Sequence, residues 1–295
     1  MNQMPMSGQP EPGLIPSRGY LICTIERTGS NLLAEALSGT GVAGRPIEYF
    51  NPVMQDKQKI RAILGGSSVI DGLTKILRAG ATPNGVFGAK LHWPHFRYLG
   101  MSIKGEWHET KRTRMHDLMR SQSPKLLSLK AVKELLNSEF SDLRAQTAAY
   151  ALLRSHLPDL RFIWLKRNNM VARAISIYRA RTTDVWYRSA GKPDPSPAEE
   201  AIDFNLSEIH NLYCIGAFQE ESWQRFFKQN NISPYSIVYE ELTANYEATI
   251  RGVLEFLEIE EAEVVIPKPI SAKQSDAMSA EWERRYRDLV ADANA

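Results

Sequence analysis

A short apolar run, a polar turn containing one glycine, and a segment with a helical apolar stripe follow one another between residues 19 and 38. Residues 19–25 (GYLICTI) are rich in β-forming side chains, which is typical of a buried strand. After the turn at 26–31 (ERTGSN), apolar positions 32, 33, 36 and 37 recur at helical spacing, and glycines at 39 and 41 offer a stop. The pattern predicts a strand, a tight turn and a helix in direct succession.

The same alternation continues along the chain. Three further strands are predicted at 85–92, 161–166 and 235–239, each bounded by turn signals or charged residues. Helices are predicted at 170–186, 197–229, 241–257 and 281–287. Strands that alternate with helices favour an α/β fold, in which a P-loop-like parallel sheet is flanked by helices on both faces.

Composition narrows the function classes. Residues 1–17 hold four prolines and no apolar core of a signal peptide, so we expect a mobile tail, a single domain over 18–295, and a cytoplasmic location. The segment around 101–133 is basic and poorly periodic, and we expect an irregular insertion with some helix there. A net charge of +2 argues against bulk binding to nucleic acid or anionic membrane, and no apolar run is long enough for a transmembrane segment. Two distant cysteines argue against a disulfide scaffold.

The first turn has the composition of an anion site. At the carboxyl end of a strand, a helix N-terminus presents unpaired N–H groups and partial positive charge. Arg27 adds a fork of donors, Gly29 allows close approach of the backbone, and short polar side chains follow at Thr28, Ser30 and Asn31. The alternative is an ordinary capped turn with a surface arginine. Neither a Walker A sequence nor a G-x-G-x-x-G fingerprint is present, which argues against a typical NTPase or dinucleotide dehydrogenase.

A second anion site is predicted at the third strand. Arg167 follows that strand directly, and Ser176 lies nine positions later in the next helix. An arginine at a strand end and a serine on the following helix can converge on one phosphate. Taken alone the pair is weak, because a surface arginine and a helix-face serine are common.

Taken together, these segments resemble a known family. Residues 22–33 are similar to the 5′-phosphosulfate loop of sulfotransferases that use 3′-phosphoadenosine 5′-phosphosulfate (PAPS), and 167–176 to their 3′-phosphate motif. The nearest resemblance is to the bacterial trehalose 2-sulfotransferase family. It is carried by GTGVAGRPIEYF at 39–50, TPNGVFGAKLHW at 82–93, AISIYRA at 174–180, the Val185-Trp186 pair, PKP at 267–269, the Lys273-Gln274 pair and EWERRYR at 281–287.

The resemblance implies roles for individual residues. The 5′-phosphosulfate would be held by Arg27, Thr28, Gly29, Ser30 and Asn31, and the 3′-phosphate by Arg167 and Ser176. Glu48 matches the acidic general base of the family, and Lys273 and Gln274 fall where a C-terminal loop often covers the nucleotide. The sequence departs from the family pattern at Asn31, where threonine is common, and at Asn168-Asn169, which replace a Pro-Asp type pair.

These residues suit sulfuryl transfer from PAPS to an acceptor hydroxyl, with PAP as product. Arg27 and the N–H groups of the loop can stabilise charge on the leaving oxygen, and an ionised Glu48 can take the hydroxyl proton. Lys90 either reaches the sulfuryl group or the sugar, or is an ordinary strand-end lysine. The acceptor implied is a carbohydrate or glycolipid, trehalose or a related glycan. Rings that can stack on a sugar, each of them alternatively a core residue, are Tyr49, Phe50, Trp93 and Trp186.

The histidines do not predict a metal site. His92 and His95 are separated by Trp93-Pro94, which argues against one helix carrying both, and no metal is expected. Two other functions stay open: a nucleotide-dependent kinase with an atypical P-loop, and a non-catalytic binding protein with a sulfotransferase-like fold. The oligomeric state is also open, a homodimer included.

Overall fold

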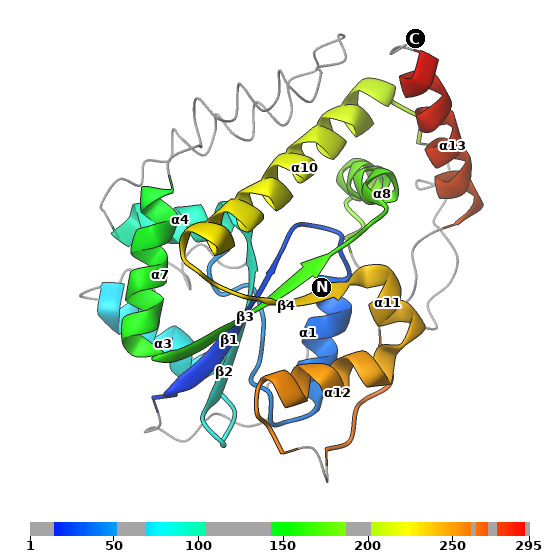
Figure 1. Ribbon diagram of the computed structural model, residues 1–295. Helices are drawn as coiled ribbons and strands as arrows, with labels where there is room; N and C mark the ends of the chain where they lie inside the picture. The colour runs from blue at the N-terminus through cyan, green and yellow to red at the C-terminus, as the bar shows by residue number, and fades with distance from the viewer. Residues whose placement is uncertain are drawn as a thin grey trace.

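The computed structural model describes residues 15–51, 69–103, 143–186, 202–260, 264–270 and 276–292. Its centre is a four-stranded parallel sheet with the order β2-β1-β3-β4 (Figure 1). The strands are β1 (Arg18–Thr24), β2 (Val86–His92), β3 (Asp159–Lys166) and β4 (Tyr235–Val238). The four predicted strands and the α/β class with a parallel sheet are confirmed.

The register brings the functional strand ends together. Cys23 on the central strand β1 lies beside Leu91 of β2 and Trp164 of β3. Because all strands run in one direction, the segments that follow β1, β2 and β3 leave from the same edge of the sheet.

One face of the sheet carries an aromatic-rich core. Alternate residues of β1, such as Leu21 and Cys23, point into it. Their partners come from α3 (Val69–Gly80), α4 (Trp93–Ile103), α7 (Arg144–His156) and α10 (Leu206–Gln229). At its centre the indole of Trp223 stacks on Phe96, with ring centroids 5.5 Å apart.

The opposite face of the sheet packs against helices whose buried side chains are mostly aliphatic. Tyr20 and Ile22, the other alternate residues of β1, are fully buried here. The covering helices are α1 (Ser30–Gly39), α11 (Tyr239–Ala244) and α12 (Tyr246–Phe256). Helices therefore cover both faces, as the alternating sequence pattern predicts (Figure 1).

A third core cluster joins three helices beyond the strand ends. α8 (Met170–Thr183) and α13 (Ala277–Asp292) pack with the first part of α10 around Ile175, Leu212 and Trp282. In Figure 1, α13 lies at the outer edge beside α8 and α10. This cluster fixes α8, and with it the segment that follows β3.

Two predicted helices have different boundaries. The helix expected over 241–257 is two helices, because Asn245 has φ −128° and ψ 48° between α11 and α12. The helix expected to reach residue 186 ends at Thr183, because Asp184 adopts a left-handed backbone with φ 58°. Among the described residues, the helix expected over 197–229 starts at Leu206, where the Asn205 side chain accepts a hydrogen bond from the Glu208 N–H.

Several predictions fall on other parts of the chain. The tail up to residue 14, the basic segment after residue 103, and the Lys273-Gln274 pair lie outside the described residues. Residues 101–103, at the start of the segment expected to be an irregular insertion with some helix, are the last residues of α4. Within the described ranges, no helix combines the length and the apolar character needed to span a membrane.

Candidate active site

The turn between β1 and α1 depends on one glycine. Gly29 has φ 81° and stands immediately before α1. A Cβ at this position would lie 2.3 Å from Cδ2 of Tyr239, which follows β4. Only glycine combines the left-handed backbone with this close approach to the aromatic ring. The turn is therefore shaped by β1 and by the end of β4 together.

Thr28 fixes the turn from inside. Its hydroxyl is completely buried and donates to the Ile25 carbonyl oxygen at 2.9 Å, and it lies 2.5 Å from Oγ1 of Thr24. The predicted contact between this hydroxyl and a phosphosulfate is therefore not available in this conformation. What the turn offers an anion is the N–H groups of the first residues of α1, which have no partner within the helix.

Arg27 joins the two predicted anion motifs. Its Nε donates to Oγ of Ser176 at 2.9 Å, and its Nη1 donates to the Trp186 carbonyl oxygen at 2.5 Å. Arg167 donates from Nη1 to the Arg27 carbonyl oxygen at 3.0 Å, and its guanidinium lies 4.8 Å from the ring centroid of Tyr239. The backbone of Arg27 is left-handed, with φ 65°, which is unusual for a residue with a side chain. Residues from the ends of β1 and β3 thus form one basic cluster.

The electrostatics of this cluster favour an anion. Burial and the nearby charge of Arg167 lower the pKa of Arg27 to about 10. Burial also lowers the pKa of Arg167, whose Nε is buried without a hydrogen-bond partner in the described part of the chain. Glu240 lies nearby, but its two carboxylate oxygens accept from the N–H groups of Asn168 and Asn169. A bound phosphate or sulfate would relieve the repulsion between the two guanidinium groups.

Glu48 is set beside the same strand ends by backbone pairing. Ile47 forms a parallel bridge with Ala89, and its carbonyl oxygen accepts from the N–H of Lys90 at 2.9 Å. This pairing holds Glu48 against the end of β2, although its own segment is not part of a strand.

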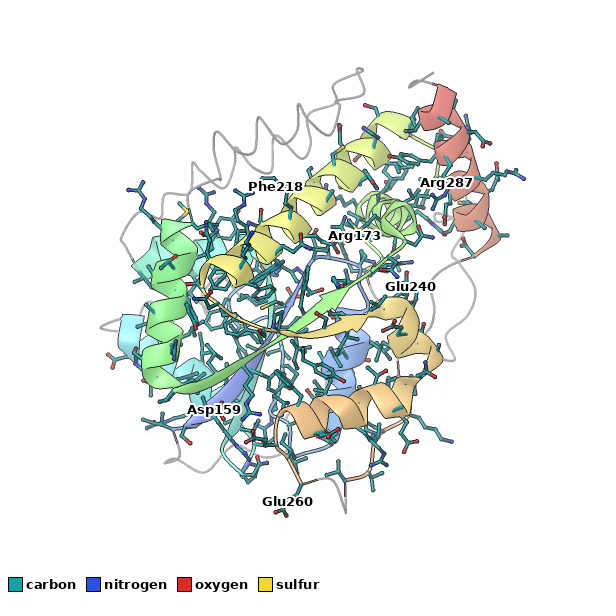
Figure 2. All side chains as sticks on the ribbon, viewed as in Figure 1. Asp159, Arg173, Phe218, Glu240, Glu260 and Arg287 are labelled. Carbon is teal, nitrogen blue, oxygen red and sulfur yellow. The ribbon has the colours of Figure 1, made fainter. Side chains whose placement is uncertain are left out.

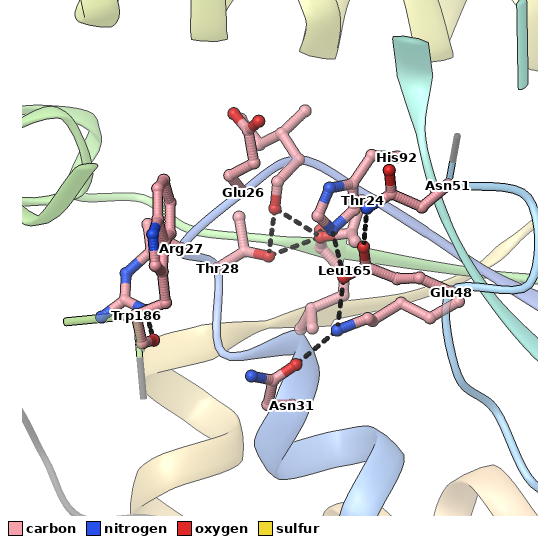
Figure 3. A network of polar contacts seen from close by, with 12 residues as sticks. Thr24, Glu26, Arg27, Thr28, Asn31, Glu48, Asn51, His92, Leu165 and Trp186 are labelled. Atoms are coloured by element: carbon pink, nitrogen blue, oxygen red, sulfur yellow. Dashed lines mark hydrogen bonds and ion pairs between the residues drawn. The ribbon is translucent and has the colours of Figure 1, made fainter. Parts of the chain in front are cut away.

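The carboxylate of Glu48 belongs to a buried polar network (Figure 3). Its Oε1 lies 2.8 Å from Nζ of Lys90, and its Oε2 accepts from Nδ2 of Asn51 at 2.6 Å. Lys90 also donates to Oδ1 of Asn31 on α1. Burial alone would raise the pKa of Glu48, but the interactions with His92 and with the charge and hydrogen bond of Lys90 outweigh it and hold that pKa well below its usual range. Lys90 therefore links the predicted base to the predicted donor loop.

Two histidines that the sequence analysis set aside lie against this network. His92 ends β2 and His95 is on α4, so no single helix carries both, but their rings stack with centroids 5.0 Å apart. Nε2 of His92 is 3.7 Å from Oε1 of Glu48. Ligand-type atoms of Glu48, His92 and His95 all lie within 4.8 Å of one another. Helical spacing does not predict this contact, because it is the turn from strand to helix that brings the two rings together.

The four aromatic residues predicted to contact a sugar differ in exposure. Phe50 and Trp93 are only 4% and 3% exposed and belong to the aromatic core, so little of either ring face is available to a sugar in this conformation. Tyr49 is partly buried and donates its hydroxyl to the Arg45 carbonyl oxygen at 3.0 Å. Trp186 is 42% exposed, and its carbonyl oxygen is the one bound by Arg27.

Sequence reasoning missed three residues that shape the site. Tyr239 contacts both Gly29 and Arg167, and its position directly after a parallel strand was the signal that could have identified it. Arg173, fully buried between α8 and α10 (Figure 2), donates from Nε to the Glu26 carbonyl oxygen at 2.9 Å and so supports the turn from behind. Asn51, three residues after Glu48, has no recognisable signal in the sequence.

The fold agrees with the comparison against protein families. The Stf0 sulphotransferase family matches residues 19–110 and 116–289, which include both anion motifs, Glu48 and most of α13. The chain is a sulfotransferase. It belongs to the Stf0 sulphotransferase family.

Two curated relatives align with this chain over nearly their whole length. The chain is 29% identical over 293 residues to the trehalose 2-sulfotransferase of Mycolicibacterium smegmatis, covering 91% of this chain and 94% of the relative. It is 26% identical to the trehalose 2-sulfotransferase of Mycobacterium tuberculosis, covering 92% and 94%.

Two solved structures were also matched. The sulfotransferase from Alicyclobacillus acidocaldarius has a TM-score of 0.40 at 12% identity, with 90% of this chain and 88% of that chain covered. The sulfotransferase domain of the Synechococcus PCC 7002 olefin synthase has a TM-score of 0.42 at 15% identity, with 95% and 90% covered. At scores this low, the family membership rests on the sequence match.

Proposed function

We propose that this sulfotransferase moves a sulfuryl group from PAPS to a hydroxyl of a carbohydrate acceptor, trehalose or a related glycan or glycolipid. The observation that carries the proposal is the hydrogen bond from Arg27 to Ser176, together with that from Arg167 to the Arg27 backbone. These contacts place the two predicted anion motifs side by side at one edge of the sheet. A donor with negative charge at both its 5′ and 3′ positions fits such a paired basic site.

The donor loop would act mainly through its backbone. N–H groups at the start of α1 and the guanidinium of Arg27 are donors that need no reorganisation when charge develops on the leaving phosphate oxygen. Arg167 and Ser176 would hold the 3′-phosphate. In the conformation described here, Ser176 accepts from Arg27, so donor binding would exchange this contact for contacts with phosphate.

Glu48 would act as the general base. Its carboxylate stays ionised at neutral pH, because its pKa is held well below the usual range. Lys90, which contacts both Glu48 and Asn31, connects it to the donor loop. In the reaction, the acceptor O–H bond breaks and its proton passes to Glu48 while the new S–O bond forms. The S–O bond to the donor phosphate breaks, and its electron pair leaves with PAP. Lys90 would stabilise the sulfuryl oxygens or the leaving oxygen.

The experiment is a transfer assay with sulfur-labelled PAPS and a panel of acceptors: trehalose, glucose, maltose and a trehalose glycolipid. Labelled sugar is the expected product, with trehalose or its glycolipid as the best acceptor. PAP binding by calorimetry provides the second readout, with AMP as the matched ligand that lacks the 3′-phosphate. Absence of both transfer and PAP binding would refute the proposal, whereas PAP binding without transfer to any sugar would support a non-catalytic role. Turnover of ATP with Mg²⁺ would support the kinase alternative.

A further inference from the structure

Two titratable side chains that lie directly against Glu48 are left unused by the proposed reaction. His92 and His95 are buried behind Glu48, with 7% and 9% of their surface exposed. Nε2 of His92 and Nδ1 of His95 are buried and have no hydrogen-bond partner among the described residues. Buried polar atoms without a partner are rare and costly, so their retention beside a predicted base calls for a functional explanation.

A metal ion would fit the identity of these ligands but not the charges around them. Glu48, His92 and His95 are a possible ligand set. However, the ammonium group of Lys90 already lies 2.8 Å from the same Oε1 of Glu48 that faces His92. Two cations at one carboxylate oxygen would repel each other strongly in a buried site. The local charge is already balanced, and a neutral imidazole is what the cluster accommodates.

The position of His92 suits a proton acceptor behind Glu48. Its Nε2 is 3.7 Å from Oε1 of Glu48 and is sealed from solvent, so it reaches an acceptor sugar only through that carboxylate. With the ring proton on Nδ1, the Nε2 lone pair faces the carboxylate. Small movements of the Glu48 side chain bring the two atoms within hydrogen-bond distance.

We propose that His92 receives the acceptor proton from Glu48 during sulfuryl transfer, with His95 stacked behind it as a positioning residue. The inference rests on the proposed function. The acceptor O–H proton moves first to Oε1 of Glu48; the new carboxyl O–H bond then breaks as an N–H bond forms at Nε2 of His92. The result is an imidazolium beside a regenerated carboxylate, and the proton leaves to solvent after the products dissociate.

The charges around His92 are consistent with this role. Burial is the main cause that lowers the pKa of His92, so the ring is neutral at pH 7 and able to accept a proton. The negative charges of Glu48, which follows Ile47, and of Glu26 in the turn after β1 raise the pKa of His92. The positive charges of Lys90 on β2 and Arg173 on α8 lower the pKa of His92 further. His95 on α4 stacks directly on the His92 ring. The site holds the pKa of Glu48 well below its usual range, so a proton that reaches this carboxyl is readily given up to a neighbouring base.

The test uses the full chain with four variants: His92→Gln, Glu48→Gln, the double variant, and His156→Gln as a control histidine at the end of α7. We expect His92→Gln to lower kcat by roughly 10²-fold with the KM for PAPS and the affinity for PAP unchanged. The double variant should be no slower than Glu48→Gln alone, because His92 acts only through Glu48. The control should retain wild-type kcat. PAP binding by each variant shows that it is folded.

A pH profile distinguishes proton acceptance from simple packing. Protonation of His92 before the reaction blocks it, so wild-type kcat should fall on the acid side with an apparent pKa below 6.5. This measurement needs no variant. In His92→Gln the acid limb should move to lower pH, because only Glu48 then has to be ionised.

Four results would overturn the inference: wild-type kcat in His92→Gln, additive losses in the double variant, an acid limb that does not move, or one bound zinc ion per purified wild-type chain by elemental analysis. Wild-type kcat in Glu48→Gln would instead refute Glu48 as the base, and with it both proposals. A slow Glu48→Gln beside a fast His92→Gln would refute the His92 role alone.

Discussion

Nε of Arg27 donates a hydrogen bond of 2.9 Å to Oγ of Ser176, although the two residues are 149 positions apart in the sequence. The contact joins the turn after β1 to the helix after β3. It exists because these strands are parallel neighbours, so their carboxyl ends share one edge of the sheet. The donor site and the base beside it are therefore connected through neighbouring strand ends, with Lys90 between them.

Replacing Glu48 by glutamine should separate chemistry from binding. The amide keeps the size of the side chain but cannot accept the acceptor proton, so we expect kcat to fall by roughly 10²–10⁴-fold. PAP binding, measured by calorimetry, should remain at the wild-type level, because Lys90 lies between Glu48 and the donor loop. An unchanged kcat would remove Glu48 from the mechanism.

Replacing Arg167 by alanine should weaken binding of the 3′-phosphate. Loss of a hydrogen bond to a charged group costs about 1.5–3 kcal/mol, so PAP should bind roughly 10- to 150-fold more weakly. AMP, which lacks the 3′-phosphate, should lose much less affinity. The control is Arg154→Ala, an exposed arginine on α7. Equal losses for PAP and AMP would mean that Arg167 only supports the Arg27 backbone.

Replacing Gly29 by alanine should damage both the fold and the donor site. The alanine would have to adopt a φ of 81°, and its Cβ would lie 2.3 Å from the Tyr239 ring. Gly41→Ala is a matched control, since it has a similar φ of 73° and nothing within 4 Å of the new Cβ. The control should cost about 1–2 kcal/mol of the free energy of unfolding. Gly29→Ala should cost about 1–3 kcal/mol more.

The functional readout of Gly29→Ala is PAP binding. It should fall markedly in this variant and stay near wild type in Gly41→Ala, because only the first turn faces the donor. Equal stability and equal PAP affinity in the two variants would contradict the tight contact with Tyr239.

Replacing Lys90 by methionine should shift the pH dependence of turnover. The Lys90 charge helps to lower the pKa of both Glu48 and His92. Without it the burial that raises the pKa of Glu48 is less opposed, so this carboxylate takes up a proton at higher pH. The acid limb of kcat should therefore move up by about one to three pH units, opposite to the shift expected for His92→Gln. An acid limb at the wild-type position would show that Lys90 does not control the base.

The strands and the donor turn could be predicted because their signals are local. Residues 19–25 alternate between two buried faces, and the turn that follows has the glycine and the polar side chains of an anion site. The α/β class followed from the alternation of strands and helices. Glu48 could be identified only through the resemblance of residues 39–50 to a family, since a single glutamate after a turn carries no chemical signal of its own.

Other features could not be predicted because they depend on packing between distant segments. Phe50 and Trp93 have the composition of sugar-binding residues, but the aromatic core around Trp223 buries them. Thr28 looks like a phosphate ligand in the sequence, yet its hydroxyl turns inward to Thr24 and Ile25. Tyr239 and Arg173 come from elements far along the chain and reach the first turn only in the folded state.

The sequence by itself determined the class of fold, the place of the donor turn and, through family resemblance, the chemistry. The tertiary structure decided the partners of each side chain: Lys90 with Glu48, Arg27 with Ser176, and His92 stacked on His95. The physical reason is that strand and helix signals arise between near neighbours in the chain. The charge and protonation of a buried group depend on atoms that only the packed sheet and its helices bring within a few ångströms.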